Sequence, residues 1–308
     1  MTLKNGYAEA ERRLEEAGIE EAALDAWLLL EHVTGISRAS YYADPDRGLP
    51  ADQWKRYREL VCRRAERVPL QHITGTQEFM GLSFEVNEHV LIPRQDTEIL
   101  VEQALGFIKS GKVPAAENGR TRILDMCTGS GCILLSVMHW AESYRQKTLC
   151  RAEDTARDGE KQDIIIIEGT GADISPQALA VAEKNARRLG VSAGFIQSDL
   201  FDAVHGRYGM ILSNPPYIRT DEIKDLQEEV RLHDPVIALD GKEDGLYYYR
   251  RIVRESRSCL EEGGMLLFEI GCDQAEAVSG LMSAAGFREI TVKKDLAGLD
   301  RVVSGVLK

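Results

Sequence analysis

Four consecutive residues, Asn-Pro-Pro-Tyr at positions 214–217, have the most specific chemical use in this chain. The Asn214 side-chain oxygen and the Pro215 backbone carbonyl can each accept a hydrogen from a planar NH2 group. Because proline fixes φ, Pro215 and Pro216 hold the two acceptors rigidly, and Tyr217 offers a flat face for stacking. The motif predicts a site that holds a planar amide or amine by its hydrogens.

Binding the two NH2 hydrogens would help a reaction at an amide nitrogen. This nitrogen is a poor nucleophile, because its lone pair is delocalised into the carbonyl group. Holding the NH2 hydrogens turns the lone pair toward an electrophile, and the proton becomes acidic once the new bond has formed. A structural turn that starts with Asn-Pro is the simpler explanation of the motif taken alone. Its place after a predicted strand at 208–213 favours the chemical one, since open α/β sheets bind ligands at the carboxyl ends of their strands.

A glycine-rich turn at residues 127–131 is the second motif, and it follows a predicted buried strand at 122–126. Glycines let the backbone approach a ligand closely, although a purely structural tight turn is the alternative. A dinucleotide-binding loop would need a third glycine, where Leu134 stands. The form Asp-x-x-Thr-Gly-x-Gly instead resembles motif I of class I methyltransferases, whose loop surrounds the methionine part of S-adenosylmethionine.

Two aspartates that end later predicted strands could complete a nucleoside site. Vicinal ribose hydroxyls suit carboxylate acceptors, and Asp173 ends the strand that begins near residue 164. Glu168 competes for this role but lies in the middle of the same strand. Asp199 could accept a hydrogen from an adenine amino group, with a helix N-cap as the alternative.

The elements that position these residues alternate between strand and helix from about residue 99, which is typical of a parallel α/β sheet. Ser175 and Pro176 are typical of a helix start, and Gly190 of its end. Residues 144–163 have almost no apolar pattern and fit an exposed or disordered insertion. The predicted strands cover residues 122–126, 164–173, 193–198, 208–213, 265–270, 290–293 and 301–307.

Residues 1–75 predict a small helical bundle, because apolar residues recur there at helical spacing. The third helix of this bundle carries six basic residues, which could form a docking surface. Acidic residues are interleaved with them, which favours a solvated face instead. Residues 79–93 change to a period of two and predict a β-hairpin with strands near 82–86 and 90–92. The basic residues of the third helix are Lys55, Arg56, Arg58, Arg63, Arg64 and Arg67.

The bulk composition argues against several classes of protein. The chain has 308 residues, 44% of them hydrophobic, and a net charge of −12, which is a poor match for a phosphate backbone. Six cysteines match no zinc ribbon, so we expect reduced thiols and no metal site. A polar N-terminus and short apolar runs predict a cytoplasmic protein without a membrane span.

Upstream segments make the resemblance more specific. Residues 69–75 (PLQHITG), 78–79 (EF) and 91–98 (LIPRQDTE) closely resemble the release-factor glutamine methyltransferases, the HemK/PrmC family, and the similarity covers nearly the whole chain. It implies a class I methyltransferase fold, α/β and Rossmann-like, with a mostly parallel seven-stranded sheet. The implied divisions are an N-terminal helical docking domain (1–75), a β-hairpin linker (76–95) and a catalytic domain (96–308).

The resemblance implies methyl transfer from S-adenosylmethionine to the glutamine amide in the Gly-Gly-Gln loop of bacterial peptide chain release factors. Release factors are then the protein partners, gripped in part by the N-terminal domain. We expect no direct nucleic-acid or membrane partner, and a monomer. The implied cofactor residues are Cys127, Thr128, Gly129, Ser130, Gly131, Asp173, Asp199, Leu200 and Asn214. The implied substrate residues are Asn214, Pro215, Pro216 and Tyr217, of which Asn214, Pro215 and Tyr217 are catalytic, and the Ile-Pro-Arg segment at 92–94 would line or cover the site.

The chain departs from the family pattern in three places. Gln95 stands where proline is usual, Leu200 replaces a frequent aromatic residue, and the insertion at 144–163 is unusual. Glu269, at the end of a late strand, could face the site or equally lie in solvent. A nucleic-acid methyltransferase using the same loop and a non-catalytic binding module are the alternatives, but the acidic charge opposes the first and the intact motifs oppose the second.

Overall fold

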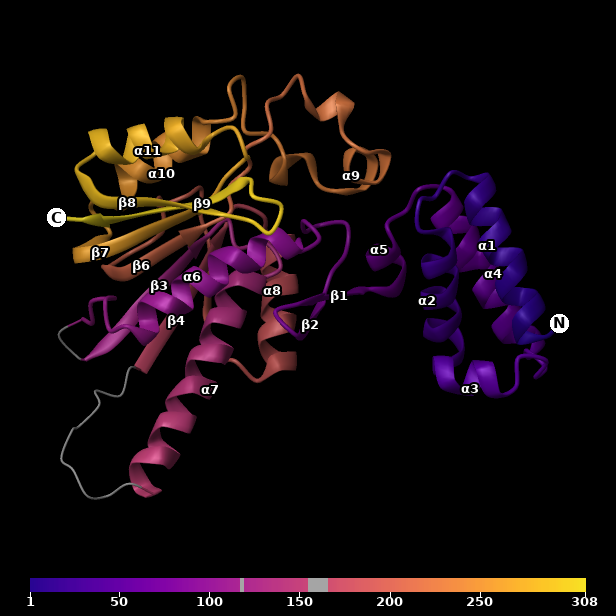
Figure 1. Cartoon of the computed structure of the whole chain (residues 1–308). Coiled ribbons are helices and arrows are strands. Elements are labelled where there is room, and N and C mark those ends of the chain that lie inside the picture. The colour runs from indigo at the N-terminus through magenta and orange to yellow at the C-terminus, as the bar shows by residue number, and fades with distance from the viewer. Residues whose placement is uncertain (117–118, 155–165) are drawn as a thin grey trace. The chain divides into compact units, whose positions relative to one another are not determined.

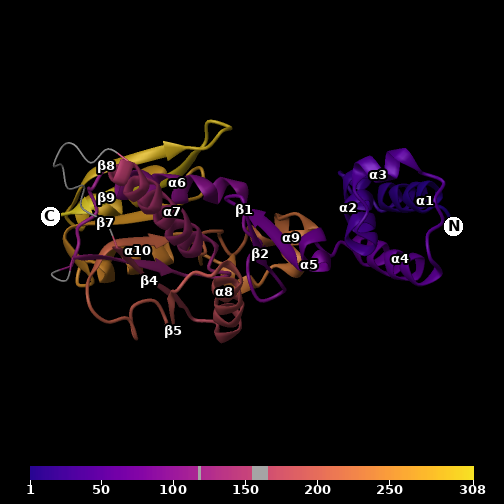
Figure 2. The ribbon, with the colours of Figure 1, turned by 90° about the horizontal axis from the view of Figure 1, so that it is seen from below.

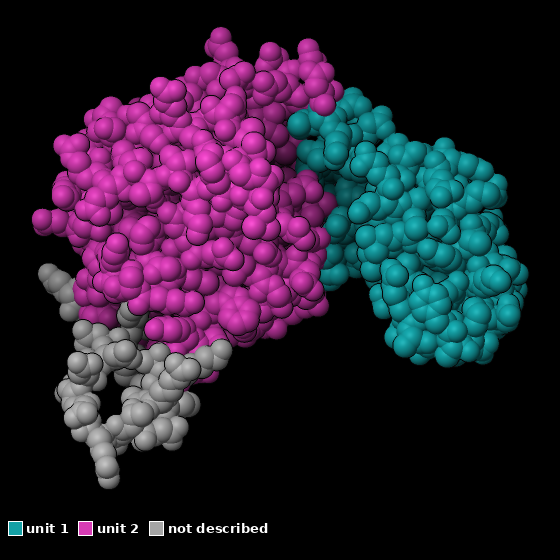
Figure 3. Space-filling model, viewed as in Figure 1, with its two compact units in different colours: residues 1–76, 226–234 teal, residues 77–225, 235–308 magenta. Residues whose placement is uncertain are grey.

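The computed structural model describes residues 1–116, 119–154 and 166–308. They form two compact units, shown in teal and magenta in Figure 3. Unit 1 comprises Met1–Thr76 and Leu226–Asp234, and unit 2 comprises Gln77–Asp225 and Pro235–Lys308. A segment inserted in the catalytic part of the sequence thus belongs to unit 1. The separate linker expected over residues 76–95 stays a prediction.

Unit 1 is helical, in agreement with the predicted bundle. Its apolar residues pack into one core, in which Leu14, Leu30 and Leu60 are completely buried. The Thr2 and Ser37 side chains accept backbone N–H groups at the starts of two helices, as N-caps. The helices of unit 1 are α1 (Leu3–Glu16), α2 (Ala22–Thr34), α3 (Arg38–Ala43), α4 (Ala51–Ala65), α5 (Leu70–Thr74) and α9 (Glu228–His233).

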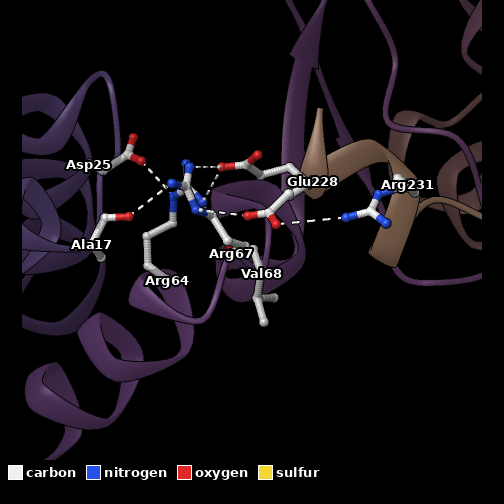
Figure 4. Close-up of polar contacts among 8 residues, drawn as sticks. Ala17, Asp25, Arg64, Arg67, Val68, Glu228 and Arg231 are labelled. Carbon is white, nitrogen blue, oxygen red and sulfur yellow. Dashed lines mark hydrogen bonds and ion pairs between the residues drawn. The ribbon is translucent and has the colours of Figure 1, made fainter. Parts of the chain in front are cut away.

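Two arginines near the end of the basic third helix, α4, are held by acidic partners within unit 1 (Figure 4). Arg64 is buried, whereas Arg67, just beyond the helix, is half-buried. Arg64 is 9% exposed, and its Nε donates to Asp25 at 2.6 Å. Arg64 and Arg67 both donate to Glu229 at 3.2 Å, which fastens α9 to α4. The expectation of a solvated face is therefore wrong for Arg64, because its partners Asp25 and Glu229 are distant in sequence.

Replacing Arg64 by alanine is expected to destabilise unit 1 by about 3–5 kcal/mol, because Asp25 would remain buried without its cation. The unfolding free energy of unit 1 can be followed in denaturant by the fluorescence of Trp27 and Trp54. Arg63→Ala is the matched control, since Arg63 is the exposed neighbour on the same helix. Equal destabilisation by the two substitutions would contradict a structural role for the buried pair.

Unit 2 is built on one sheet of seven strands among the described residues, in the order β5-β4-β3-β6-β7-β9-β8. β9 runs antiparallel to its two neighbours, and the other pairs are parallel. Figure 2 shows β5 and β8 at opposite edges of this sheet. The strands are β3 (Arg120–Met126), β4 (Ile166–Asp173), β5 (Gly194–Gln197), β6 (Tyr208–Ser213), β7 (Leu260–Glu269), β8 (Phe287–Lys294) and β9 (Asp300–Leu307).

Helices cover both faces of the sheet, as Figure 1 shows. Because side chains alternate along a strand, Ile123 packs in the core under α6 and α7, whereas Leu124 packs in the core under α10 and α11. The expected α/β fold with a mostly parallel seven-stranded sheet is confirmed. The helices of unit 2 are η1 (Gln95–Thr97), α6 (Glu98–Lys109), α7 (Cys132–Asp154), α8 (Pro176–Leu189), η2 (Ile223–Asp225), η3 (Val236–Ala238), α10 (Tyr247–Ser256) and α11 (Ala275–Ala284).

The β-hairpin exists, but one of its two predicted strands is wrong. β2 (Leu82–Glu85) pairs with β1 (Thr76–Phe79) and not with residues 90–92, which form no strand. Met80 and Gly81 connect the two strands with φ values of 53° and 72°. Two successive positive φ values make a tight turn whose twist matches that of a hairpin.

The proposed insertion at 144–163 is also corrected in part. Helix α7 continues to Asp154, so its first residues are helical, and residues 155–163 lie outside the described part of the chain. Within the helix, the Arg145 side chain bonds Glu142 at 2.7 Å, one turn earlier. No helix within the described residues combines the length and the apolar character that crossing a membrane requires.

Candidate active site

The two sequence motifs meet at the point where the strand order reverses. From β3 the chain proceeds outward to β4 and β5, and it then returns to β6 on the other side of β3. Met126 and Ser213, the last residues of β3 and β6, are paired in register, and the Ser213 hydroxyl donates to the Met126 carbonyl at 2.7 Å. The loops that follow these strands therefore flank the crevice where open α/β sheets bind ligands.

The glycine loop is shaped by hydrogen bonds to two aspartates. The Thr128 hydroxyl donates to Asp125 at 2.6 Å, and the Gly129 N–H donates to Asp173 at 2.9 Å. Gly129 and Gly131 have φ values of 53° and 78°, a conformation in which glycine carries no steric cost. A side chain at Gly131 would also crowd α7 and α8, since its Cβ would lie 3.2 Å from that of Ala182.

Asp173 occupies the position that a diol-binding carboxylate needs. It ends β4 next to the glycine loop, is half-buried, and accepts the N–H groups of Gly129 and Ser175 at 2.9 Å each. An ionised carboxylate has about four acceptor positions, so backbone bonds from Gly129, Ser175 and Ile174 leave room for a further donor. Burial raises the pKa of Asp173. Glu168 lies earlier in β4 and pairs with Arg120, away from this edge of the sheet.

A cavity of about 230 Å³ lies over these loops. Pro93 and Arg94 of the Ile-Pro-Arg segment line it, as the sequence analysis expected. Gly131, Pro215 and Tyr217 are not among its lining residues: Gly131 shapes the turn behind it, and the other two follow Asn214 in the chain. The predicted cofactor and substrate residues that line the cavity are Cys127, Thr128, Gly129, Ser130, Asp173, Asp199, Leu200, Asn214 and Pro216.

Asp199 lies at the cavity in an exposed turn. No helix begins there, so the N-cap alternative is wrong. Its Oδ1 accepts from the Arg251 guanidinium at 2.8 Å, a pairing that the sequence did not indicate. The next residue, Leu200, is 5% exposed and has a φ of 50°, which is costly for a side chain and is held here by burial. The adenine-binding roles of both residues stay predictions.

The Asn-Pro-Pro-Tyr loop is held by two other segments of the chain. Gln274 donates to the Tyr217 carbonyl at 3.0 Å, and the backbone of Gly241 lies so close that a Cβ there would be 2.7 Å from the Tyr217 Cα. Pro215 is buried, and Asn214 is half-buried at the cavity. Backbone packing therefore adds to the rigidity that the prolines provide.

Glu269 at the end of β7 lies in the interior, so the alternative that it faces solvent is wrong. It is 2% exposed, and the side chains of Thr97 and Asn214 hydrogen-bond to its carboxyl group. Burial raises the pKa of Glu269 to about 7, although these bonds and the charge of Arg301 oppose the shift. Burial likewise raises the pKa of Asp125, beneath the glycine loop, to about 7.

Helix α10 forms a wall of the cavity that no sequence motif predicted. Tyr247, Tyr248 and Arg251 line the cavity, whereas Tyr249 points into the core and is fully buried. Three consecutive tyrosines were an available signal, because neighbours in a helix point about 100° apart and cannot all be buried on one side. The η3 segment Val236–Ala238 contributes two further lining residues that no motif marked.

Comparisons with known proteins agree with this architecture. Residues 7–75 match the PrmC N-terminal domain, and residues 160–230 match the methyltransferase small domain. The catalytic domain of hMettl16, solved with MAT2A 3'UTR hairpin 6, has a TM-score of 0.50 and 13% identity over 81% of this chain and 82% of its own. That similarity concerns the fold alone.

Curated relatives are closer in sequence. A release factor glutamine methyltransferase of Geobacter sulfurreducens is 40% identical over 293 residues, which is 95% of this chain and 92% of the relative. One of Cereibacter sphaeroides is 40% identical over 309 residues, covering 100% of this chain and 99% of the relative. The chain belongs to the release factor glutamine methyltransferase family.

Proposed function

We propose that this chain transfers a methyl group from S-adenosylmethionine to the side-chain amide nitrogen of the glutamine in the Gly-Gly-Gln loop of bacterial peptide chain release factors. One observation carries the proposal. Asn214, the hydrogen acceptor of the Asn-Pro-Pro-Tyr loop, lines the same cavity as Asp173 and the glycine loop. An amide held at Asn214 and a nucleoside held at Asp173 would therefore share one enclosed space.

The residues present fit the methyl donor. The Asp173 carboxylate can accept the two ribose hydroxyls, and the backbone of residues 127–131 can approach the amino-acid part closely. Leu200 and Ile174 offer apolar surface beside Asp199 for the adenine ring. When bound, S-adenosylmethionine supplies a methyl group made electrophilic by its sulfonium.

Asn214 and Pro215 prepare the substrate nitrogen for this transfer. The Asn214 side-chain oxygen and the Pro215 carbonyl each accept one hydrogen of the glutamine NH2, which leaves the nitrogen lone pair facing the methyl group. With the lone pair so aligned, the nitrogen would take the methyl group, and the bond to sulfur would break with its electron pair left on the sulfur. The nitrogen then loses one proton to solvent, so the site needs no strong base.

Mass spectrometry of a purified release factor, incubated with the protein and S-adenosylmethionine, tests this function. We expect one methyl group on the Gly-Gly-Gln glutamine. A release factor with alanine in place of that glutamine is the control and should gain none. Absence of the methyl group from the intact release factor, while the protein binds the cofactor, would contradict the proposed substrate.

The setting of the reaction follows from this substrate. We propose that the chain acts in the cytoplasm, as a monomer, on a protein partner that unit 1 helps to grip. Its net charge of −12 supports a protein substrate over a nucleic acid. Methylation of DNA or ribosomal RNA in the same assay would contradict that preference.

A further inference from the structure

The proposed grip on the substrate depends on which way the Asn214 amide points. An asparagine side chain has an oxygen that accepts and an NH2 group that donates, and the two ends have nearly the same shape. Only the oxygen can hold a hydrogen of the substrate NH2 group. If the side chain turned over, two NH2 groups would face each other, and the substrate amide would lose its acceptor.

Glu269 is placed to decide this orientation. It ends β7 directly after Phe268, which is paired with Ser213, so Glu269 and Asn214 follow paired residues of two adjacent strands. Glu269 is 2% exposed, and hydrogen bonding from Thr97 and Asn214 favours the charged form of its carboxyl group. An ionised carboxylate can only accept, so it binds the NH2 end of Asn214 and leaves the oxygen for the substrate. The second carboxyl oxygen of Glu269, Oε2, has no hydrogen-bond partner among the described residues.

We propose that Glu269 is the positioning residue of this site, whose ionised carboxylate fixes the Asn214 amide with its oxygen toward the substrate, and whose protonation releases that orientation. The inference rests on the proposed function for its effect on turnover. The orientation itself is a property of the protein alone and can be observed without substrate.

The surroundings of Glu269 make its ionisation sensitive to pH near neutrality. Burial disfavours the charge and Asp96 adds a repulsion, whereas Arg301 favours it, and the resulting pKa is about 7. Arg301 also forms ion pairs with Asp295 at 2.9 Å and with Asp96 at 3.2 Å. Its positive charge is therefore shared among three carboxyl groups and only partly stabilises the charge of Glu269. The titratable groups that face Glu269 are Asp96 from η1, Cys132 from α7, Tyr217 from the loop after β6, Tyr249 from α10 and Arg301 from β9.

The sign of the effect follows from these groups. The pKa values of Cys132, Tyr217 and Tyr249 are raised by burial, so these groups stay neutral around pH 7. Below its pKa, Glu269 carries an O–H that can donate to the Asn214 oxygen and turn the amide over. Turnover should therefore fall as the pH drops through about 7 and level off above it.

Turnover number against pH, at saturating cofactor and release factor, gives the first test. Wild type should rise to a plateau with an inflection near 7. Glu269→Gln keeps an acceptor but fixes the orientation incompletely, so its turnover at high pH should be about tenfold lower and without the inflection. Its cofactor affinity should be unchanged. Glu262→Gln, an exposed change on the same strand, should behave as wild type.

The second test needs no substrate. In protein made with isotope-labelled asparagine, the Asn214 side-chain NH2 signals are assigned by their loss in Asn214→Ser. They should shift with pH around 7 in wild type and in Asp125→Asn, which removes the other buried carboxyl group of similar pKa. In Glu269→Gln the shift should vanish. A shift that survives in Glu269→Gln, or is absent from wild type, overturns the proposal.

The two tests separate the two proposals. If wild type methylates no release factor at any pH while the Asn214 signals titrate through Glu269, the proposed function fails and the positioning role stands. If wild type methylates the release factor but Glu269→Gln keeps full turnover and the inflection, the positioning role fails and the function stands.

Discussion

Replacing Asn214 by alanine should lower the turnover number by about a hundredfold or more, because the substrate NH2 group loses its side-chain acceptor and Glu269 loses a hydrogen-bond donor. The effect should fall on the chemical step, since the glycine loop and Asp173 are untouched. Mass spectrometry of the release factor over time gives the turnover number, and calorimetry gives the dissociation constant of the cofactor, which we expect to change by less than about threefold.

Asn5→Ala provides the control for this substitution. Asn5 is an exposed residue of α1 in unit 1, so the same chemical change there should leave turnover and cofactor affinity as in wild type. Full turnover in Asn214→Ala would remove Asn214 from the proposed chemistry. If Asn214→Ala lost cofactor affinity to the same extent as turnover, the main contact of Asn214 would be with the cofactor and not with the substrate amide.

Replacing Asp173 by alanine should weaken cofactor binding by about ten- to a hundredfold. A hydrogen bond to a charged group contributes about 1.5–3 kcal/mol, and about 1.4 kcal/mol corresponds to a factor of ten. The substitution also leaves the Gly129 N–H without its acceptor, so the glycine loop loses a support. Turnover at saturating cofactor should fall much less, because within the described residues the side-chain hydrogen bonds of Asp173 go to Gly129, Ile174 and Ser175 and not to the Asn-Pro-Pro-Tyr loop.

Glu168→Ala is the matched control, because Glu168 is an acidic residue of the same strand and was the competing candidate for the ribose. Its side chain is 40% exposed and pairs with Arg120 instead. Calorimetric titration of both variants with S-adenosylmethionine should show weak binding by Asp173→Ala alone. Equal weakening by Glu168→Ala, or a loss confined to turnover in Asp173→Ala, would contradict the assignment.

Predictions from the sequence were most successful where the signal is local. Ser175 accepts the Ala178 N–H, Pro176 opens α8, and Gly190 ends it in the left-handed conformation, all as their residue types indicate. The strand at 208–213 was predicted to the residue, and all six of its residues are buried, as in a strand covered on both faces. Each of these features is decided by side chains within a few residues of one another.

Predictions failed where the partner lies far away in the chain. The burial of Arg64 depends on Asp25 and on Glu229, which is 165 residues away. The pairing of Asp199 with Arg251 spans 52 residues. Long side chains such as arginine suit either water or a buried pair, so only their partners determine which environment they occupy.

By itself, the sequence determined the fold class, the two chemical motifs and the family resemblance, because motif spacing and strand–helix alternation are local properties of the chain. Only the tertiary structure decided that residues 226–234 join unit 1, that α10 lines the cavity, and that Glu269 is buried next to the end of β6, where Asn214 follows. The strand-end carboxyl group of Glu269 has the same local pattern whether it faces water or a site. Its environment is created when β7 is placed beside β6 in the sheet, which brings it to Asn214.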